Sequence, residues 1–254
     1  VARVAANEAF GVTNVGNMSD IGAAGDAQKA YDAGVTIGTY LKQLGFNVDY
    51  APVADVLTNP GNTAIGTRSF GSDASMVADM VIKELEGLSS QGVFGAVKHF
   101  PGQGGVSGDS HDGAVTLDKS LEELMQTELV PFQKALENGV SFVMVGHISV
   151  PQVVGDNTPA SLSQMMVSNV LREQLGYQGI VITDAMNMGA VTGNYTADQA
   201  AVMAVNAGVD MILMPQDYET AYNGLLQAVQ DGTISEERID ESVERIVKVK
   251  LQMQ

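Results

Sequence analysis

Two of the three histidines of the chain lie in one short glycine-rich stretch, KHFPGQGGVSGDSHDG, which runs from residue 98 to residue 113. Asp109 precedes His111 by two residues, a spacing at which a carboxylate can accept one imidazole N–H while the other ring nitrogen exchanges a proton near neutral pH. The part around His111 has no apolar periodicity, so we do not expect it in a core. The pattern predicts an acid/base pair on a loop, although two solvated polar residues in a flexible loop would have the same sequence.

Polar residues also end several apolar runs, and these are the other candidates for chemistry. Asp184 follows GIVIT directly, where a carboxylate can be a nucleophile, a general base, a metal ligand or only the cap of the next helix. Lys98 and His99 end FGAVKH, either as donors to substrate hydroxyls or as a structural ion pair. His147 ends SFVMVGH and either lines the same site or hydrogen-bonds its rim. Arg68, in GTRSFG, can hold a polar ligand with its planar fork or remain a solvated charge.

The elements that position these residues alternate between short β-rich runs and helical patterns. We predict strands over 47–56, 94–99, 141–147, 179–185 and 209–215. Neighbouring strand residues point to opposite faces, so of Lys98 and His99 we expect one to point into the site. The predicted helices cover 26–44, a segment from the cap Asp73 to Leu88, a segment from the capping box at Ser120 to Gly139 with a kink at Pro131, and 163–175, 197–207, 218–230 and 235–251.

This alternation implies a parallel sheet covered by helices, either an open doubly wound sheet or a (β/α)₈ barrel. A barrel gathers its site from many strand ends, whereas an open sheet uses mainly its switch point, and no GxGxxG loop is present. The polar strand ends therefore favour an α/β fold of the (β/α)₈, TIM-like barrel type, as one catalytic domain over 1–254. These strand ends carry Asp55, Lys98, His99, His147, Asp184 and Asp217.

The barrel is expected to be incomplete at the N-terminus of this chain. About eight strands close such a barrel, and only five are predicted here. We expect an upstream segment or a separate polypeptide to supply the others, because an exposed parallel-sheet edge is a liability. The first residues, VARVAANEAF, include neither an initiator methionine nor a signal peptide, so the compartment stays open between the cytoplasm and the cell envelope or extracellular space.

The composition excludes several classes of partner. Thirteen basic and thirty acidic side chains give a formal charge of −17, which repels nucleic acids and anionic lipid head groups, so a neutral partner is easier to accept. The absence of cysteine excludes disulfides, thiolate metal sites and a cysteine nucleophile. No apolar run approaches the roughly 18 residues of a membrane span.

Taken together, the motifs resemble those of family three glycoside hydrolases, within them the bacterial β-N-acetylglucosaminidases that act on peptidoglycan fragments or chitooligosaccharides. The resemblance implies a barrel-like catalytic domain, a small saccharide containing N-acetylglucosamine as substrate, and no cofactor. It runs through the whole chain, in the family's order, over VAR, NVDYAPVADV, AIGTRSFGSD, KHFPGQGG, DSH, MVGHI, PASLS, GIVITDAMNM and AGVDMILMP.

The resemblance also implies roles for single residues. Asp184 is implied to be the nucleophile, and His111 the acid/base with Asp109 as its partner. Sugar binding is implied for Arg3, Arg68, Lys98 and His99. Two departures stand out: position 103 is glutamine where these enzymes usually have histidine, and the family's acidic strand end before VAR, which carries a substrate-binding aspartate, lies upstream of Val1.

Three other functions remain open from the sequence. The first is a β-N-acetylglucosamine or β-glucoside phosphorylase, or a β-glucosidase, of the same family. The second is a metal-dependent barrel hydrolase with Asp184, His99, His111 and His147 as ligands, although neither HxH nor HExxH occurs. The third is a saccharide-binding protein without catalysis.

Overall fold

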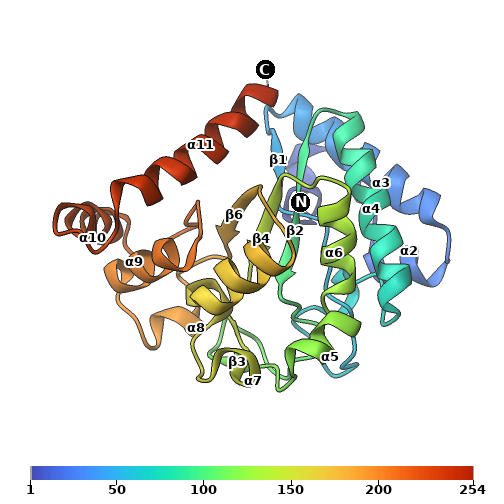
Figure 1. Cartoon of the computed structure of the whole chain (residues 1–254). Coiled ribbons are helices and arrows are strands. Elements are labelled where there is room, and N and C mark those ends of the chain that lie inside the picture. Colours follow the sequence, from blue (N-terminus) through green and yellow to red (C-terminus); the bar gives the residue numbers. More distant parts are fainter. Residues whose placement is uncertain (1, 254) are drawn as a thin grey trace.

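A parallel four-stranded sheet forms the centre of the protein in the computed structural model, which describes the backbone of residues 2–253 and the side chains of 4–253. The strands are β1 (Val48–Asp49), β2 (Phe94–Phe100), β4 (Phe142–Val145) and β6 (Ile180–Thr183), in the order β1-β2-β4-β6 (Figure 1). Each strand thus pairs with its neighbour in the predicted series. A second ribbon, which the sequence did not predict, pairs β3 (Val115–Thr116) with β5 (Ile148–Ser149) in parallel.

The segment 209–215 does not form the predicted strand. It meets β6 at one parallel bridge, between Ile182 and Met211. Two residues further on, the N–H of Leu213 donates to the side-chain oxygen of Thr183 rather than to a backbone carbonyl, at 3.0 Å. The ladder therefore ends after one bridge, although the segment still lies beside β6.

The predicted helices are confirmed, two of them with differences. The segment 120–139 forms two helices, α5 (Leu121–Gln126) and α6 (Val130–Glu137), because Pro131 lies in the first turn of α6, where its missing N–H costs nothing. The helix predicted over 163–175 is a π-helix, η4 (Met165–Gln174). The remaining long helices are α3 (Ala27–Gln43), α4 (Ala74–Ser90), α9 (Ala197–Ala207), α10 (Tyr218–Gln230) and α11 (Glu236–Gln252).

Short helical segments complete the described chain. They are α1 (Ala2–Ala5), η1 (Glu8–Phe10), α2 (Met18–Ala23), η2 (Gly66–Arg68), α7 (Pro151–Val154), η3 (Ala160–Leu162) and α8 (Gly189–Thr192). No helix in the described range is long and apolar enough to cross a membrane.

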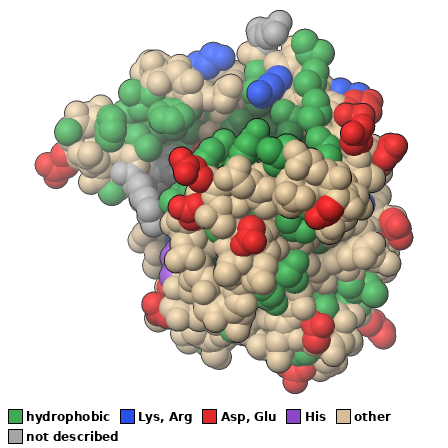
Figure 2. All heavy atoms as spheres, turned by 90° about the vertical axis from the view of Figure 1, so that its left-hand side faces the viewer, with side chains coloured by type: hydrophobic (Ala, Val, Ile, Leu, Met, Phe, Trp, Pro, Cys, Tyr) green, Lys and Arg blue, Asp and Glu red, His purple; other side chains and the backbone are tan. Residues whose placement is uncertain are grey.

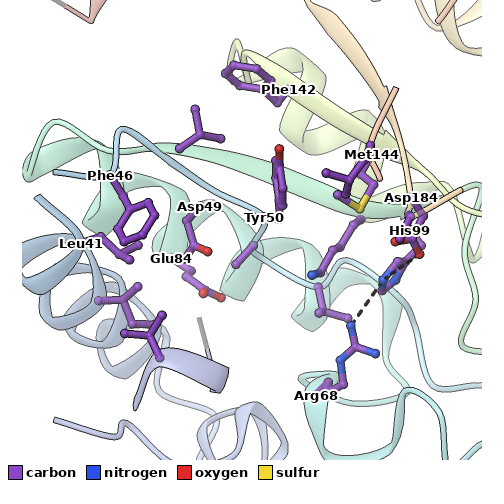
Figure 3. Close-up of a pocket in the computed structure, with 18 of the residues that line it drawn as sticks. Leu41, Phe46, Asp49, Tyr50, Arg68, Glu84, His99, Phe142, Met144 and Asp184 are labelled. Atoms are coloured by element: carbon purple, nitrogen blue, oxygen red, sulfur yellow. Dashed lines mark hydrogen bonds and ion pairs between the residues drawn. The ribbon is translucent and has the colours of Figure 1, made fainter. Parts of the chain in front are cut away.

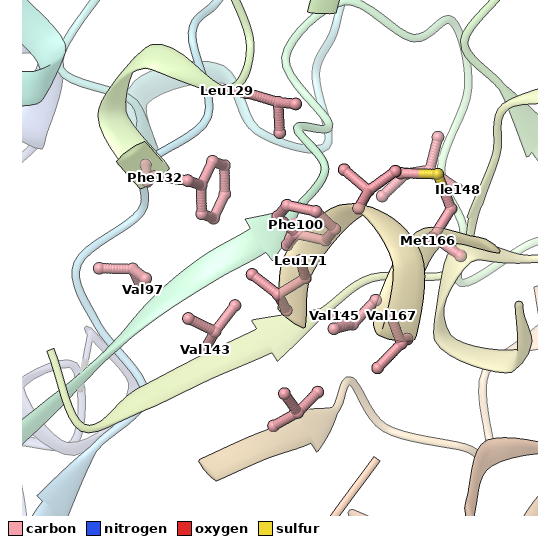
Figure 4. Packing of buried hydrophobic residues seen from close by; sticks show 14 of the residues in the cluster. Val97, Phe100, Leu129, Phe132, Val143, Val145, Ile148, Met166, Val167 and Leu171 are labelled. Atoms are coloured by element: carbon pink, nitrogen blue, oxygen red, sulfur yellow. The ribbon is translucent and has the colours of Figure 1, made fainter. Parts of the chain in front are cut away.

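The main core lies between one face of the sheet and helices α4, α6 and η4 (Figure 4). Val97, Val143 and Val181 point into it from three successive strands. The rings of Phe100 and Phe132 meet edge to face, with centroids 5.5 Å apart. This packing fixes the strands whose carboxyl ends carry the candidate residues.

The other face of the sheet surrounds a hollow, as the inner face of a barrel wall does. Phe142 and Ile180 pack there with Val249 of α11, which runs toward the β1 side of the sheet (Figure 1). Apolar side chains gather around a hollow in the face shown in Figure 2. No strand within residues 2–253 closes the gap between β1 and the segment at Met211. The fold is thus an α/β barrel of TIM-like type with an incomplete wall, as predicted.

Candidate active site

One cavity of about 1080 Å³ lies at the carboxyl ends of the strands and continues along the inner face of the sheet. The residues at 184 and 111, which the sequence places far apart, both line it. So do five further charged or polar candidates, whose arrangement Figure 3 shows in part: Arg68, Lys98, His99, Gln103 and Asp109. The expected convergence of strand ends is therefore present.

Asp184 follows β6 directly and is held by the sheet on one side. Its backbone N–H donates to the carbonyl of Val145 at 2.9 Å, and its Oδ1 accepts the N–H of Ala185 at 2.8 Å. The Oδ2 lies 3.9 Å from Nε2 of His99, and the side chain is 17% exposed. One carboxylate oxygen is thus fixed, while the other lies beside His99.

The carboxyl group of Asp184 is held in its ionised form. Burial raises its pKa, but His99, the N–H of Ala185 and Lys98 lower it, and the net shift of the pKa is downward. An ionised carboxylate that is partly shielded from water is suited to attack an electrophilic carbon.

Asp55 orients His99 beside Asp184. Its Oδ2 lies 2.7 Å from Nδ1 of His99, and its Oδ1 accepts the backbone N–H groups of His99 and Gln103 at 3.2 and 2.6 Å. Arg68 Nη2 approaches Nε2 of the same ring at 3.4 Å (Figure 3). From the sequence, Asp55 was recognised only as a polar residue at the end of a predicted strand. Its place at a strand end is the signal that could have indicated its role in holding His99.

Lys98 and His99 both line the cavity, which differs from the expected alternation. The pairing of β2 with β4 shifts register between Val97 and Phe100, so the regular two-residue alternation does not hold there. His99 is buried, whereas Lys98 is half-buried. Burial lowers the pKa of Lys98, and the charge of Arg68 lowers it further, against the opposing effects of Asp184, Asp49 and Asp55.

The predicted pair on the glycine-rich loop is formed. Nδ1 of His111 lies 2.7 Å from Oδ1 of Asp109, which also accepts the backbone N–H of His111 at 2.9 Å. These hydrogen bonds, the backbone one foremost, lower the pKa of Asp109. The His111 side chain is 59% exposed. Because Nδ1–H donates its hydrogen bond to the carboxylate, the Nε2 atom is left to exchange a proton with a ligand.

His147 does not line the cavity; it lies beneath it. Its Nε2 faces the carbonyl of Ala185 at 3.0 Å, and its Nδ1 faces Oγ of Ser161 at 2.7 Å. A carbonyl only accepts, so the proton is on Nε2 and Nδ1 accepts the serine hydroxyl. Burial lowers the pKa of His147, which agrees with this neutral ring. The side chain thus holds the peptide next to Asp184.

Two other predictions concern the edges of the site. The side chain of Arg3 lies outside the described residues. Asp217 is exposed and caps α10, where its Oδ1 accepts the N–H of Thr220 at 2.7 Å, so it is a helix cap outside the cavity lining.

The imidazoles proposed as metal ligands are engaged otherwise. His99 and His111 each direct Nδ1 to an aspartate, and both nitrogens of His147 are hydrogen-bonded. In the described part of the chain, no three His, Cys, Asp or Glu side chains are grouped so as to hold a metal ion. The metal-dependent alternative therefore has no ligand cluster in this geometry.

Two buried carboxyl groups line the far part of the cavity, and the sequence did not single them out. Asp49 on β1 and Glu84 on α4 lie near each other (Figure 3), and each has one oxygen without a hydrogen-bond partner among the described residues. Burial raises the pKa of Asp49 to about 6 and that of Glu84 to about 8. The position of Glu84 among apolar helix residues could have signalled this.

The chain is similar to known proteins over most of its length. The family model described as "Glycosyl hydrolase family 3 N terminal domain" matches residues 6–249. A relative named beta-hexosaminidase A, from Pseudoalteromonas piscicida, is 32% identical over 278 residues, which cover 100% of this chain and 46% of the relative. The chain thus spans about half the length of that relative.

Two solved structures resemble the fold closely. A glycoside hydrolase family 3 beta-N-acetylglucosaminidase from Paenibacillus sp. str. FPU-7 is 43% identical, with a TM-score of 0.93 over 96% of this chain and 47% of that one. A beta-glucoside phosphorylase, BglX, bound to 2FGlc is 27% identical, with a TM-score of 0.92 over 95% of this chain and 45% of that one.

Proposed function

This chain belongs to glycosyl hydrolase family 3 and matches the N-terminal domain of that family. We therefore propose that it is the catalytic domain of a retaining β-N-acetylhexosaminidase. The observation that carries the proposal is that the ionised carboxylate of Asp184 and the His111–Asp109 pair line one cavity. The names of the similar proteins support N-acetylglucosamine as the sugar. Peptidoglycan fragments and chitooligosaccharides are the substrate class we propose.

In the first step, Oδ2 of Asp184 attacks the anomeric carbon and the bond to the aglycone oxygen breaks. Nε2 of His111 gives its proton to that oxygen, so the aglycone leaves as an alcohol and a glycosyl ester forms on Asp184. In the second step, neutral His111 takes a proton from water, whose oxygen displaces the carboxylate. Two inversions give net retention.

The remaining residues bind the sugar or hold the reacting groups. Arg68 and Lys98 present N–H donors to the cavity and His99 presents its Nε2 atom, so that all three can bind sugar hydroxyls. Asp55 keeps the His99 ring in place, and His147 holds the carbonyl of Ala185, so both act as positioning residues. A further segment of a longer protein, or a separate polypeptide, completes the barrel wall in this proposal, since the relative is about twice as long.

The test uses the full-length protein with 4-nitrophenyl β-N-acetylglucosaminide and the matching β-glucoside. We expect preference for the N-acetylglucosaminide, loss of hydrolysis in Asp184→Asn, and slow turnover in His111→Ala. Azide should speed up that turnover and give the glycosyl azide as product, because azide displaces the Asp184 carboxylate without a general base. A 2-fluoro sugar should label Asp184. Activity that survives in Asp184→Asn would disprove the proposal, and preference for the glucoside would assign a β-glucosidase.

Phosphorolysis is the second candidate, and the imidazole at the acid/base position favours it. A protonated imidazole becomes neutral when it gives up its proton, whereas a carboxylic acid becomes anionic, so phosphate meets less repulsion here. The similar structure of a β-glucoside phosphorylase agrees with this chemistry. Adding phosphate and comparing sugar 1-phosphate with free sugar as product decides between the two. Saccharide binding without either product would instead indicate a non-catalytic binding protein.

A further inference from the structure

Gln103 contacts both halves of the candidate site. It is 4% exposed, and its backbone N–H donates to Oδ1 of Asp55, the carboxylate that holds His99. Its side-chain Nε2 donates to Oγ of Ser110 at 3.1 Å, and Ser110 directly precedes His111. Its backbone carbonyl accepts a hydrogen bond from Nδ2 of Asn62 at 2.6 Å. One buried residue thus links the ring beside the nucleophile to the loop of the acid/base.

The peptide at Ser110 and His111 is held from a second side as well. The N–H of Gly189 donates to the carbonyl of His111, and the N–H of Ala190 donates to that of Ser110, both at 3.1 Å. Gly189 has no room for a side chain, since a Cβ there would lie 2.7 Å from the carbonyl oxygen of His111. The residues around the exposed imidazole are therefore held by Gln103 and, separately, by the backbone N–H groups of Gly189 and Ala190.

We propose that Gln103 is a positioning residue that sets the place of the His111 imidazole relative to Asp184, through its contacts with Ser110 and Asp55. The proposal rests on the assignment of His111 as acid/base. The serine hydroxyl alone cannot do this, because Ser110 contacts no other described side chain by a hydrogen bond. An amide has no charge at any working pH, so the pH does not change this link.

The dependence on the leaving group tests the proposal in the full-length enzyme. A badly placed acid hinders departure of a poor leaving group and matters little for a good one. For Gln103→Ala we expect kcat/KM on phenyl β-N-acetylglucosaminide to fall by about 10- to 100-fold, and by less than about 3-fold on the 2,4-dinitrophenyl substrate. Ser110→Ala should show the same pattern, and the double variant should be no worse than the poorer single variant.

Asn59→Ala is the matched control. Its side-chain amide holds the same loop through Val106 and Ser107, away from His111, so its removal should leave the leaving-group dependence at the wild-type value. Equal loss on both substrates in Gln103→Ala, or no loss on either, would overturn the positioning role. Failure of the proposed function would give a different result from both. The wild type would then hydrolyse neither substrate, or His111→Ala would show the same leaving-group dependence as the wild type.

Discussion

The imidazole of His99 and the carboxylate of Asp55 form a buried pair beside the proposed nucleophile, with 2.7 Å between Nδ1 and Oδ2 and exposed side-chain fractions of 5% and 0%. Asp55 accepts three hydrogen bonds from two residues of the β2 end and its following loop. Its carboxylate therefore fixes the orientation of a ring that lies 3.9 Å from Asp184.

Asp55→Asn should impair the enzyme through this ring. An amide cannot accept at both positions, and hydrogen bonds to charged groups contribute about 1.5–3 kcal/mol. We expect kcat/KM for the N-acetylglucosaminide to fall by roughly 10- to 100-fold, with similar loss on good and poor leaving groups. The remaining amide oxygen can still accept the N–H of Gln103, so the link to the acid/base is kept and only the contact with the His99 ring is lost. Asp79→Asn, at an exposed position on α4, is the control and should retain wild-type activity.

The acid side of the pH profile should reflect the lowered pKa of Asp184. Because this pKa lies below its usual value, the carboxylate stays ionised at pH values at which an ordinary aspartate begins to take up a proton. With the 2,4-dinitrophenyl substrate, whose departure needs little help from an acid, kcat/KM should therefore stay level as the pH falls into the usual aspartate range. A loss of activity that begins above that range would contradict the assignment of Asp184 as the nucleophile.

Glu84→Gln should make the stability less dependent on pH. Burial raises the pKa of Glu84 from 4.5 to about 8, so between these values the unfolded chain loses a proton that the folded protein keeps. Rising pH then favours unfolding, and this contribution to stability declines from about pH 4.5 to about pH 8. Denaturant unfolding should show similar stability of variant and wild type at pH 4.5 and a more stable variant at pH 9. Glu86→Gln, at an exposed position on the same helix, should show no such difference in stability from the wild type at pH 9.

Asp210→Asn should destabilise the fold far from the site. The buried carboxylate of Asp210 accepts from Arg172 at 2.6 Å and from Arg245 at 3.1 Å, and so ties η4 and α11 to the beginning of the segment 209–215 beside β6. Removing one partner leaves cations uncompensated, at a cost of about 3–5 kcal/mol in the free energy of unfolding. Glu241→Gln removes an exposed partner of the same cluster and should change that free energy by less than about 1 kcal/mol. Equal effects in urea titrations of the two variants would contradict this reasoning.

Local pattern was enough to predict most elements and the contact between Asp109 and His111. The caps at Asp26, Asp73, Ser120 and Ser235 mark helix starts because each side chain accepts a backbone N–H within three residues. The Asp109–His111 contact is equally local, since two residues separate the partners. Such features depend on neighbours in the chain, and the sequence displays them directly.

Irregular backbone and contacts between distant segments could not be predicted from such local patterns. Lys98 and His99 both reach the cavity because β2 shifts register, which no alternation rule shows. His147 was placed correctly at a strand end, but its direction was set by Ser161 and Ala185. Asp49 on β1 and Glu84 on α4 are far apart in the sequence and come near each other only in the fold, so the sequence does not indicate that they are neighbours.

The sequence by itself determined the alternation of the main strands with helices, the helix caps and the residue types at the strand ends, since these follow from spacings of a few residues. Only the tertiary structure decided which of those side chains meet. The places of Asp55, Gln103 and His147 around Asp184, the proposed nucleophile, depend on loop geometry and on buried hydrogen bonds between segments up to 48 residues apart. Such contacts exist only after the strands have packed against their helices, because that packing brings the distant partners within hydrogen-bonding distance.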